Sequence, residues 1–351
     1  MNSLDINVDR TRAQGVSSSA DRTLSPMPAG STAPGAVVAS ARRIAGAALP
    51  GFARELGERY EIRGQLGEGA FGIVFLAWDR LMGREVAIKT LKELRGDLVM
   101  RFRREAELLA RLAHPNILRV FDRQLDGDPP YMITERVDGE TLADHLRSVR
   151  LELDHALALC AQVGDAVAYG HSHGILHRDI KPSNVFVLRE GGVKLGDFGL
   201  AREIAAGTTL TRCGVLVGTP LYLSPEMVCG KRATPESDQY ALGVMAYQMV
   251  TGTPPFTGDS VENILGARLL DDPKPPRAVN PELPPDVDAL IMKALARKPA
   301  DRFASVEAFS AAARATAGVP AGPLSPLASA SIESEATLSP GACLGQSGSE
   351  L

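Results

Sequence analysis

Two short strings in the middle of the chain carry residue types that can move a phosphoryl group. Residues 177–184 read HRDIKPSN, and residues 197–199, which follow thirteen positions later, read DFG. Asp179 can accept a proton from an attacking hydroxyl, and Lys181 can neutralise charge on the phosphate in transfer. Because phosphoryl transfer depends mainly on positioning and on charge neutralisation, the two strings together predict that chemistry.

The same strings contain candidate ligands for a divalent cation. Asn184 closes the first string and Asp197 opens the second. Amide and carboxylate oxygens are the ligands that Mg²⁺ prefers in proteins. We therefore expect Asn184 and Asp197 to hold Mg²⁺, with Mn²⁺ as an alternative metal.

A glycine-rich string lies about one hundred residues earlier. Residues 67–74 read GEGAFGIV, which fits the pattern G-x-G-x-x-G-x-V. Similar glycines occur in dinucleotide-binding turns, but those turns need a helix directly after the glycines. Here an apolar stretch ending at Trp78 follows, and residues 79–84 then form a turn. The pattern favours a β-hairpin that closes over phosphates with its backbone N–H groups.

Lys89 stands at the end of the next apolar run and needs an anionic partner. A lysine here would ordinarily face solvent, but after a phosphate-binding loop it is interpreted as the cation for the α- and β-phosphates. Glu105 is the best candidate partner and Glu107 the second. Glu105 lies four residues before Leu109 on the apolar side of the expected helix, whereas Glu107 points elsewhere.

Apolar periodicity divides the middle of the chain into two parts. The first part has short apolar runs and one stretch of helical spacing, and the second part, from Thr141 onward, is mostly helical. Asp154 is expected to cap a helix that runs toward His171. The runs predict strands at 73–76, 85–88, 117–120 and 131–133, and a helix at about 98–112. The expected fold class is α+β and bilobal, with a small β-rich lobe carrying one main helix and a larger, mostly helical lobe.

Composition excludes several classes of protein. The chain has 351 residues, a net charge of −4 and a pI near 5.9, which argues against nucleic acid as a partner. Its four cysteines show no Cys-x-x-Cys spacing, as expected of a reduced cytoplasmic protein without structural zinc or disulfides. The first residues show no basic region followed by an apolar run, so no signal peptide is expected, and no apolar run of about eighteen residues occurs in the sequence. We expect a soluble, cytoplasmic protein without a membrane span.

Both ends of the chain have a different composition from the middle. Residues 1–55 and 319–351 are rich in Ser, Ala, Gly and Pro, and too poor in large apolar residues to offset the entropy of ordering. We expect both segments to be disordered, either as plain solvated tails or with a regulatory role. The working domain is expected at 56–318, with lobes at about 60–135 and 139–316.

Taken in order, five strings resemble the signature of one family. The segments 67–74, 86–89, 177–184, 197–199 and 224–226 match a Hanks-type protein kinase in sequence and spacing, over about residues 60–316. The chain is most similar to the bacterial serine/threonine kinases. The resemblance implies a protein-kinase fold, ATP as cofactor, and transfer of the γ-phosphoryl group to Ser and Thr hydroxyls of proteins. It also implies autophosphorylation, through a transient dimer.

The resemblance assigns roles to individual residues. Lys181 implies serine/threonine rather than tyrosine specificity. The residues implied in catalysis are Asp179, Lys181, Lys89 and Glu105, and those implied in metal binding are Asn184 and Asp197. The residues implied in ATP binding are Leu66, Gly67, Glu68, Gly69, Ala70, Phe71, Gly72, Ile73, Val74, Ala87, Lys89, Thr134, Glu135, Val137 and Phe186.

Other roles implied by the family are structural. Glu226 should pair with Arg302, and Asp238 should hold the backbone of the catalytic loop that contains Arg178. The residues expected to stack as a spine between the lobes are Leu109, Val120, His177 and Phe198. The remaining histidines are expected to be structural.

The segment between Asp197 and Glu226 is the expected place of regulation. Thr208, Thr209 and Thr211 are its available hydroxyls, with Thr211 the favoured site of phosphorylation. A phosphothreonine there would pair with Arg178 and order the segment. The alternative is that these threonines only keep a loop soluble.

Thr219 and Cys213 lie in the same segment, and a separate role is expected for each. Thr219 would contact the catalytic loop itself. Cys213 is either a redox switch or, as is commoner for a lone cysteine, inert.

Two rival functions remain to be weighed. A pseudokinase would keep the fold as a binding module, but the residue types at Lys89, Asp179, Asn184 and Asp197 are all those of an active enzyme. A small-molecule phosphotransferase would share the bilobal architecture. The intact segment 219–226, which in protein kinases shapes a peptide groove, speaks against it.

Overall fold

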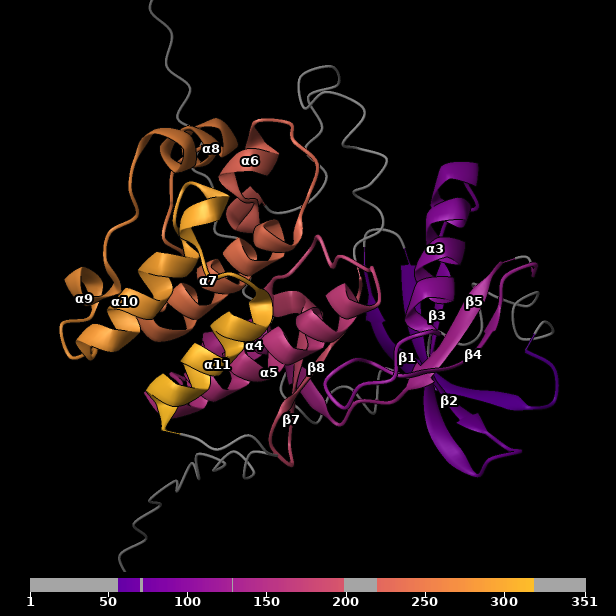
Figure 1. Cartoon of the computed structure of the whole chain (residues 1–351). Coiled ribbons are helices and arrows are strands. Elements are labelled where there is room, and N and C mark those ends of the chain that lie inside the picture. The colour runs from indigo at the N-terminus through magenta and orange to yellow at the C-terminus, as the bar shows by residue number, and fades with distance from the viewer. Residues whose placement is uncertain (1–55, 70–71, 128, 199–219, 319–351) are drawn as a thin grey trace, which may run out of the picture.

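The computed structural model describes residues 56–69, 72–127, 129–198 and 220–318. Two lobes lie side by side in Figure 1, a sheet in indigo and magenta next to a group of helices in magenta, orange and yellow. The expected bilobal α+β architecture is therefore confirmed. In the described parts of the chain, no helix combines the length and the apolar character needed to cross a membrane.

The smaller lobe is a five-stranded antiparallel sheet with one helix. Its strands are β1 (Tyr60–Glu68), β2 (Gly72–Asp79), β3 (Arg84–Leu91), β4 (Val120–Gln124) and β5 (Tyr131–Glu135), in the order β1-β2-β3-β5-β4. The central strand β3 buries Val86, Ala87 and Ile88 in succession, because both of its faces are covered. Helix α3 (Gly96–Leu109) lies beside β3 and β4 and supplies Phe102, Ala106 and Leu109 to the core.

The expected strand at 117–120 is wrong. Ile117 is buried, but it forms a single parallel bridge with Leu195 of the other lobe, and the strand β4 begins only at Val120. The Leu118 N–H donates to the Leu195 carbonyl at 2.9 Å, and the Leu195 N–H donates to the Asn116 carbonyl at 2.8 Å. Residues 117 and 118 therefore bond to the helical lobe, whereas the Arg119 carbonyl accepts from the Glu135 N–H of β5 at 2.9 Å and Val120 pairs with Thr134 in the sheet.

The larger lobe contains a small sheet and most of the helices. The three strands are β6 (Gly139–Thr141), β7 (Val185–Leu188) and β8 (Val193–Leu195), paired in that order. The helices are α4 (Leu142–Ser148), α5 (Leu153–Ser172), α6 (Pro225–Val228), α7 (Pro235–Thr251), α8 (Val261–Leu270), α9 (Pro276–Val279), α10 (Pro285–Ala294) and α11 (Val306–Ala317). Short 3₁₀ turns occupy Pro182–Asn184, Pro220–Tyr222 and Pro299–Asp301.

Helices α5 and α7 form the centre of this lobe. Both are apolar on most sides, and α5 packs against α7 and α11. The expected cap at Asp154 is wrong by two residues, because the last extended residue before α5 is Glu152. Asp154 instead lies in the first turn, where a negative charge is favoured by the helix dipole.

Candidate active site

The glycine-rich string forms the turn of a β-hairpin, as expected. Gly67 pairs with Val74 and Glu68 with Ile73, and the Gly69 N–H donates to the Gly72 carbonyl at 2.9 Å. A strand and not a helix follows the glycines, so the dinucleotide-binding alternative is excluded.

Gly72 has a steric reason to be glycine. A Cβ added at this position would lie 2.5 Å from the backbone oxygen of Thr90 on β3. Leu66, just before the string, is half exposed, and the expected contact residues Ala70 and Phe71 lie outside the described residues. The glycine thus allows the hairpin to lie close against the strand that carries Lys89.

Lys89 makes the contact that the sequence predicted and one more. It lies in β3 opposite Met132 and Val74, and its Nζ is 3.0 Å from Oε1 of Glu105 on α3. The same Nζ also forms an ion pair with the carboxylate of Asp197. Glu107 is exposed, which agrees with the choice of Glu105.

The charges of this cluster are set by mutual attraction. Burial would lower the pKa of Lys89, but the negative charges of Asp197 and Glu105 outweigh it and raise that pKa above its ordinary value. The positive charge of Lys89 in turn holds the pKa of Asp197 below its ordinary value. At neutral pH the cluster contains an ammonium facing an ionised Asp197 carboxylate.

The catalytic loop between α5 and β7 brings Asp179, Lys181 and Asn184 together. Nζ of Lys181 donates to Oδ2 of Asp179 at 2.7 Å. Nδ2 of Asn184 donates to the same oxygen at 3.1 Å and to the Asp179 carbonyl at 2.8 Å. The Asp179 side chain retains 24% of its exposure, so its carboxylate is fixed in direction yet open to a substrate hydroxyl.

A buried carboxylate holds the loop from behind. Asp238 of α7 accepts from the backbone N–H groups of His177 and Arg178, each at 2.8 Å, and lies 2.9 Å from Nε2 of His171. Arg178 has a φ of 66°, a strained backbone value for a residue other than glycine. The two hydrogen bonds to Asp238, on adjacent backbone groups, help to maintain this conformation.

The expected metal ligands are adjacent. The Gly196 N–H donates to the Asn184 carbonyl at 2.9 Å, which brings Asn184 next to the start of the second string, and Asp197 has a φ of 48°. Because Nδ2 of Asn184 is directed at Asp179, its Oδ1 is the atom that can face a cation. Among the described residues no group of three or more His, Cys, Asp or Glu could hold a metal. Asn184 and Asp197 thus offer two oxygen donors, and an ion held there would need further oxygen ligands from elsewhere.

Part of the expected spine is visible in the contacts. The rings of His177 and Phe198 lie 4.6 Å apart, and Leu109 and Val120 belong to the same apolar cluster as Phe198. His177 is fully buried, with Nε2 3.0 Å from the Gly196 carbonyl. Burial lowers the pKa of His177, so the ring is neutral at pH 7.

The segment that joins the lobes contains contacts that sequence reasoning missed. Oε1 of Glu135 accepts from the backbone N–H of Arg119 at 2.7 Å and from Nζ of Lys194 at 2.8 Å. Lys194 is the charged residue between the two apolar residues of β8. Its position in the sequence could have indicated that it needs a buried or half-buried carboxylate partner.

The other expected residues of the adenine pocket lie on both sides of this segment. Thr134 is buried beside Ala87, across the pair β3 and β5. Val137 and Phe186 are half buried. Ala87 and Thr134 thus lie in the five-stranded sheet of the smaller lobe, and Phe186 lies in β7 of the larger lobe.

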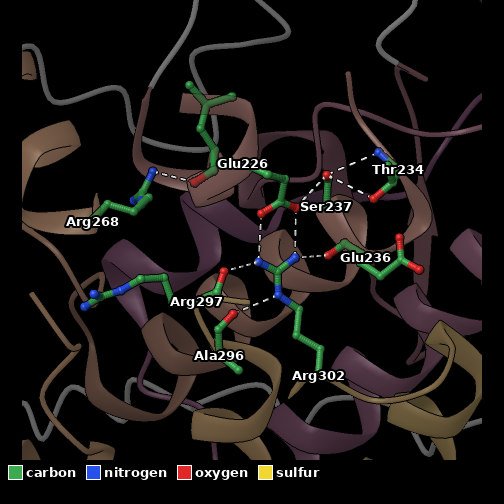
Figure 2. A network of polar contacts seen from close by, with 9 residues as sticks. Glu226, Thr234, Glu236, Ser237, Arg268, Ala296, Arg297 and Arg302 are labelled. Atoms are coloured by element: carbon green, nitrogen blue, oxygen red, sulfur yellow. Dashed lines mark hydrogen bonds and ion pairs between the residues drawn. The ribbon is translucent and has the colours of Figure 1, made fainter. Parts of the chain in front are cut away.

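A second cluster of charges lies deep in the helical lobe. Figure 2 shows the guanidinium of Arg302 facing the carboxylate of Glu226 through two hydrogen bonds of 2.9 and 2.8 Å, as the sequence predicted. Ser237 donates to Oε1 of Glu226 at 2.8 Å, and Arg302 also donates to the Glu236 carbonyl at 2.7 Å. The supporting partners Ser237 and Glu236 were not predicted.

Several expected residues cannot be placed. Gly199, Cys213 and the four threonines of the activation segment lie outside the described residues. The phosphorylation of this segment stays a prediction. The four threonines are Thr208, Thr209, Thr211 and Thr219.

Comparison with known proteins shows which family and which relatives the chain is similar to. A family model described as "Protein kinase domain" matches residues 60–312. The serine/threonine-protein kinase PksC of Streptomyces coelicolor is 43% identical over 279 residues, which cover 76% of this chain and 49% of PksC. PknB of Mycobacterium tuberculosis, also named a serine/threonine-protein kinase, is 40% identical over 257 residues, which cover 71% of this chain and 41% of PknB.

A solved structure is similar as well. A crystal structure of Rad53 in complex with AMP-PNP matches with a TM-score of 0.61 and 26% identity, covering 72% of this chain and 64% of that one. The chain spans roughly two-fifths to one-half of the length of the curated relatives it matches.

Proposed function

The chain belongs to the protein kinase domain family, and from this premise we propose that it transfers the γ-phosphoryl group of ATP to Ser and Thr hydroxyls of proteins. The observation that carries the proposal is the position of Lys89, which contacts Glu105 of the small lobe and Asp197 of the large lobe at once. This contact joins the expected nucleotide-binding strand to the expected metal ligand.

Each residue of the proposed mechanism has a task that follows from its contacts. Asp179, oriented by Lys181 and Asn184, accepts the proton of the substrate hydroxyl as the new P–O bond forms and the bond from the γ-phosphorus to the bridging oxygen breaks, so that ADP leaves. Lys181 then neutralises charge on the transferred phosphoryl group. Lys89, held by Glu105, binds the α- and β-phosphates of ATP, and the hairpin glycines let backbone N–H groups approach the phosphate oxygens.

The proposed metal is Mg²⁺, with Mn²⁺ as the alternative. Asp197 and Oδ1 of Asn184 would hold the ion, which would neutralise the phosphate oxygens and bridge them to the protein. The proposed ATP-contact residues are those assigned from the family resemblance, with Thr134, Glu135, Val137 and Phe186 around the adenine. AMP-PNP in the Rad53 structure supports a nucleotide in a fold of this kind.

The proposal extends to partners and regulation. We propose that the substrates are Ser- and Thr-containing proteins, that residues 56–318 form the working domain, and that the segment between Asp197 and Glu226 is phosphorylated, at Thr211 in the first place. Transfer between two copies in a transient dimer would achieve this without another enzyme. The names of the relatives PksC and PknB support the substrate class.

A transfer assay tests the proposed function. Purified protein is incubated with γ-labelled ATP and a mixture of basic proteins, in parallel with Mg²⁺, Mn²⁺ and EDTA. We expect label on Ser and Thr of the acceptors with either metal and none with EDTA. A protein that binds ATP without any transfer would identify a binding module, and label on small metabolites alone would identify a small-molecule phosphotransferase.

A further inference from the structure

Arg268 is the largest side chain that is fully buried in the described part of the chain, with 1% of its surface exposed. It projects from α8, and Figure 2 shows it next to the cluster formed by Glu226 and Arg302. A buried guanidinium is costly unless its N–H groups are used in hydrogen bonds. Its contacts therefore indicate why an arginine occupies this position.

Two of its contacts are hydrogen bonds to backbone carbonyls, and both carbonyls belong to one turn. Nη1 of Arg268 donates to the Leu223 carbonyl at 2.7 Å and Nη2 donates to the Leu221 carbonyl at 2.5 Å. Both carbonyls belong to residues 220–224, here named the entry turn, which lead directly into α6. The forked guanidinium thus fixes two alternate carbonyls of one short segment.

Aromatic side chains hold the guanidinium in turn. The carbon Cζ of Arg268 lies 5.9 Å from the ring centre of Tyr240 on α7 and 5.5 Å from that of Phe256. Burial lowers the pKa of Arg268, although Tyr240 opposes this shift. Together with these two rings Arg268 lines a cavity of about 90 Å³, beside the loop that follows α8.

From this arrangement we propose that Arg268 is a positioning residue for the polypeptide substrate: it sets the carbonyl directions of the entry turn. The inference rests on the proposed function, because the segment 219–226 is the part that shapes the peptide groove in the family the chain resembles. It adds a residue on α8, outside every motif of the sequence, to the machinery that selects the substrate.

The neighbouring Arg302 provides a contrast within the same region. Arg302 binds a carboxylate, Glu226, and carbonyls of the loops behind it, so its contacts hold the helical lobe together. The two backbone hydrogen bonds of Arg268, in contrast, are both with the entry turn itself. Tyr222 of the turn is also hydrogen-bonded to Gln248 of α7, so the turn keeps one anchor when Arg268 is replaced. Loss of Arg268 should therefore misdirect the turn without unfolding it.

Steady-state kinetics of the full chain test this inference. In R268M the two carbonyls lose their donors, and we expect the KM for a peptide acceptor to rise about tenfold while the KM for ATP stays within about twofold. R268K, whose single ammonium reaches one carbonyl, should fall between R268M and the wild type. The matched control is R297M: Arg297 lines the same cavity but donates to the Leu270 carbonyl and to Asp272. It should leave both KM values unchanged.

Amide exchange of the turn separates this inference from the function on which it rests. The Leu221, Tyr222, Leu223 and Ser224 N–H groups should exchange about tenfold faster in R268M, with α7 unchanged. Equal rises in the KM for ATP and the KM for the peptide would mean that Arg268 has only a structural role, and this result would overturn the proposal. Unchanged KM values in R268M would overturn it as well. If the wild type transfers no phosphate, the proposed function and the substrate role both fail. The exchange rates then decide only whether Arg268 holds the turn.

Discussion

The cluster around Lys89 and the cluster around Arg302 each combine a basic side chain with a carboxylate, and they differ in where they lie. Lys89, Glu105 and Asp197 keep 26%, 18% and 55% of their side-chain exposure and come from both lobes. Arg302 and Glu226 keep 0% and 8% and come from the helical lobe alone. The first cluster is reachable by a ligand and depends on how the lobes sit together, whereas the second is closed.

This difference in burial separates a reactive site from a scaffold. Partly exposed ion pairs contribute less to stability than buried ones, since water screens them, and so Lys89 can exchange carboxylate contacts for phosphate oxygens at a smaller cost. A buried pair that loses one partner leaves an uncompensated charge in the interior. Changes in the first cluster should therefore affect the reaction, and changes in the second should affect folding.

The largest expected effect is on turnover. Lys89→Met and Asp179→Asn each remove a charge used in the transfer, and we expect phosphoryl transfer to fall about a thousandfold or more in both. Urea unfolding should change little, because both side chains are partly exposed. If either variant, shown folded by circular dichroism, keeps more than about a tenth of the wild-type rate, the role assigned to that residue is wrong.

The buried pair should show the opposite pattern. Arg302→Met leaves Glu226 without its main partner, and the free energy of unfolding should drop by about 3–5 kcal/mol. The matched control is Arg80→Met, which breaks the exposed pair with Glu61 and should cost less than about 1 kcal/mol. Urea titrations measure both free energies of unfolding, and equal losses in the two variants would remove the distinction between buried and exposed ion pairs.

Within the reactive cluster, one helix offers an internal control. Glu105→Gln weakens the hold on Lys89, and we expect kcat/KM for ATP to fall about tenfold, since an ion pair becomes a hydrogen bond from the ammonium to an uncharged amide oxygen. Glu107→Gln, two residues away on the exposed side of α3, should stay within about twofold of the wild type. Similar losses in both variants would point to the stability of α3 instead of the contact with Lys89.

The pH dependence of the free energy of unfolding should show how much the ionised Glu226 carboxylate, paired with Arg302, stabilises the fold. Burial would raise the pKa of Glu226, but the hydrogen bonds from Arg302 outweigh it and hold that pKa below its ordinary value of 4.5. The stabilisation is therefore present above the unfolded-state pKa and is lost as the pH falls through the lower folded-state pKa. In urea titrations the stability difference between wild type and Glu226→Gln should be larger at pH 7 than at pH 4. A constant difference would mean that Glu226 does not titrate with folding.

The smallest expected effect on activity is that of removing the two terminal segments, residues 1–55 and 319–351. A protein of residues 56–318 contains both clusters, and its activity toward a generic protein acceptor should stay within about twofold of that of the full chain. The two proteins are compared under the same assay conditions. A collapse of activity would place a third working element in one of the terminal segments.

The parts of this picture that could be predicted from the sequence have local causes. The hairpin followed from glycines before an apolar strand, and the choice of Glu105 over Glu107 followed from the helical period. The pair of Glu226 with Arg302 could be predicted only through resemblance to a family, since 76 positions separate the two residues.

The missed features depend on contacts between distant segments. The run at 117–120 has the composition of a strand, yet its first two residues bond to β8 of the other lobe. Strand β1 was not predicted, because along it only Tyr60 is fully buried and the apolar alternation is weak. Arg268 escaped notice because a charged residue on a helix ordinarily faces solvent.

The bonds between residues 116–118 and Leu195 have a consequence for engineering. A chimera that exchanged the small lobe as one continuous piece, with its junction after β5, would carry residues 116–118 away from the strand to which they are bonded. The two lobes are therefore not exchangeable as continuous halves of the chain. A designer who recombines such lobes needs to transplant β8 (Val193–Leu195) together with this segment, or to cut the chain on both sides of it.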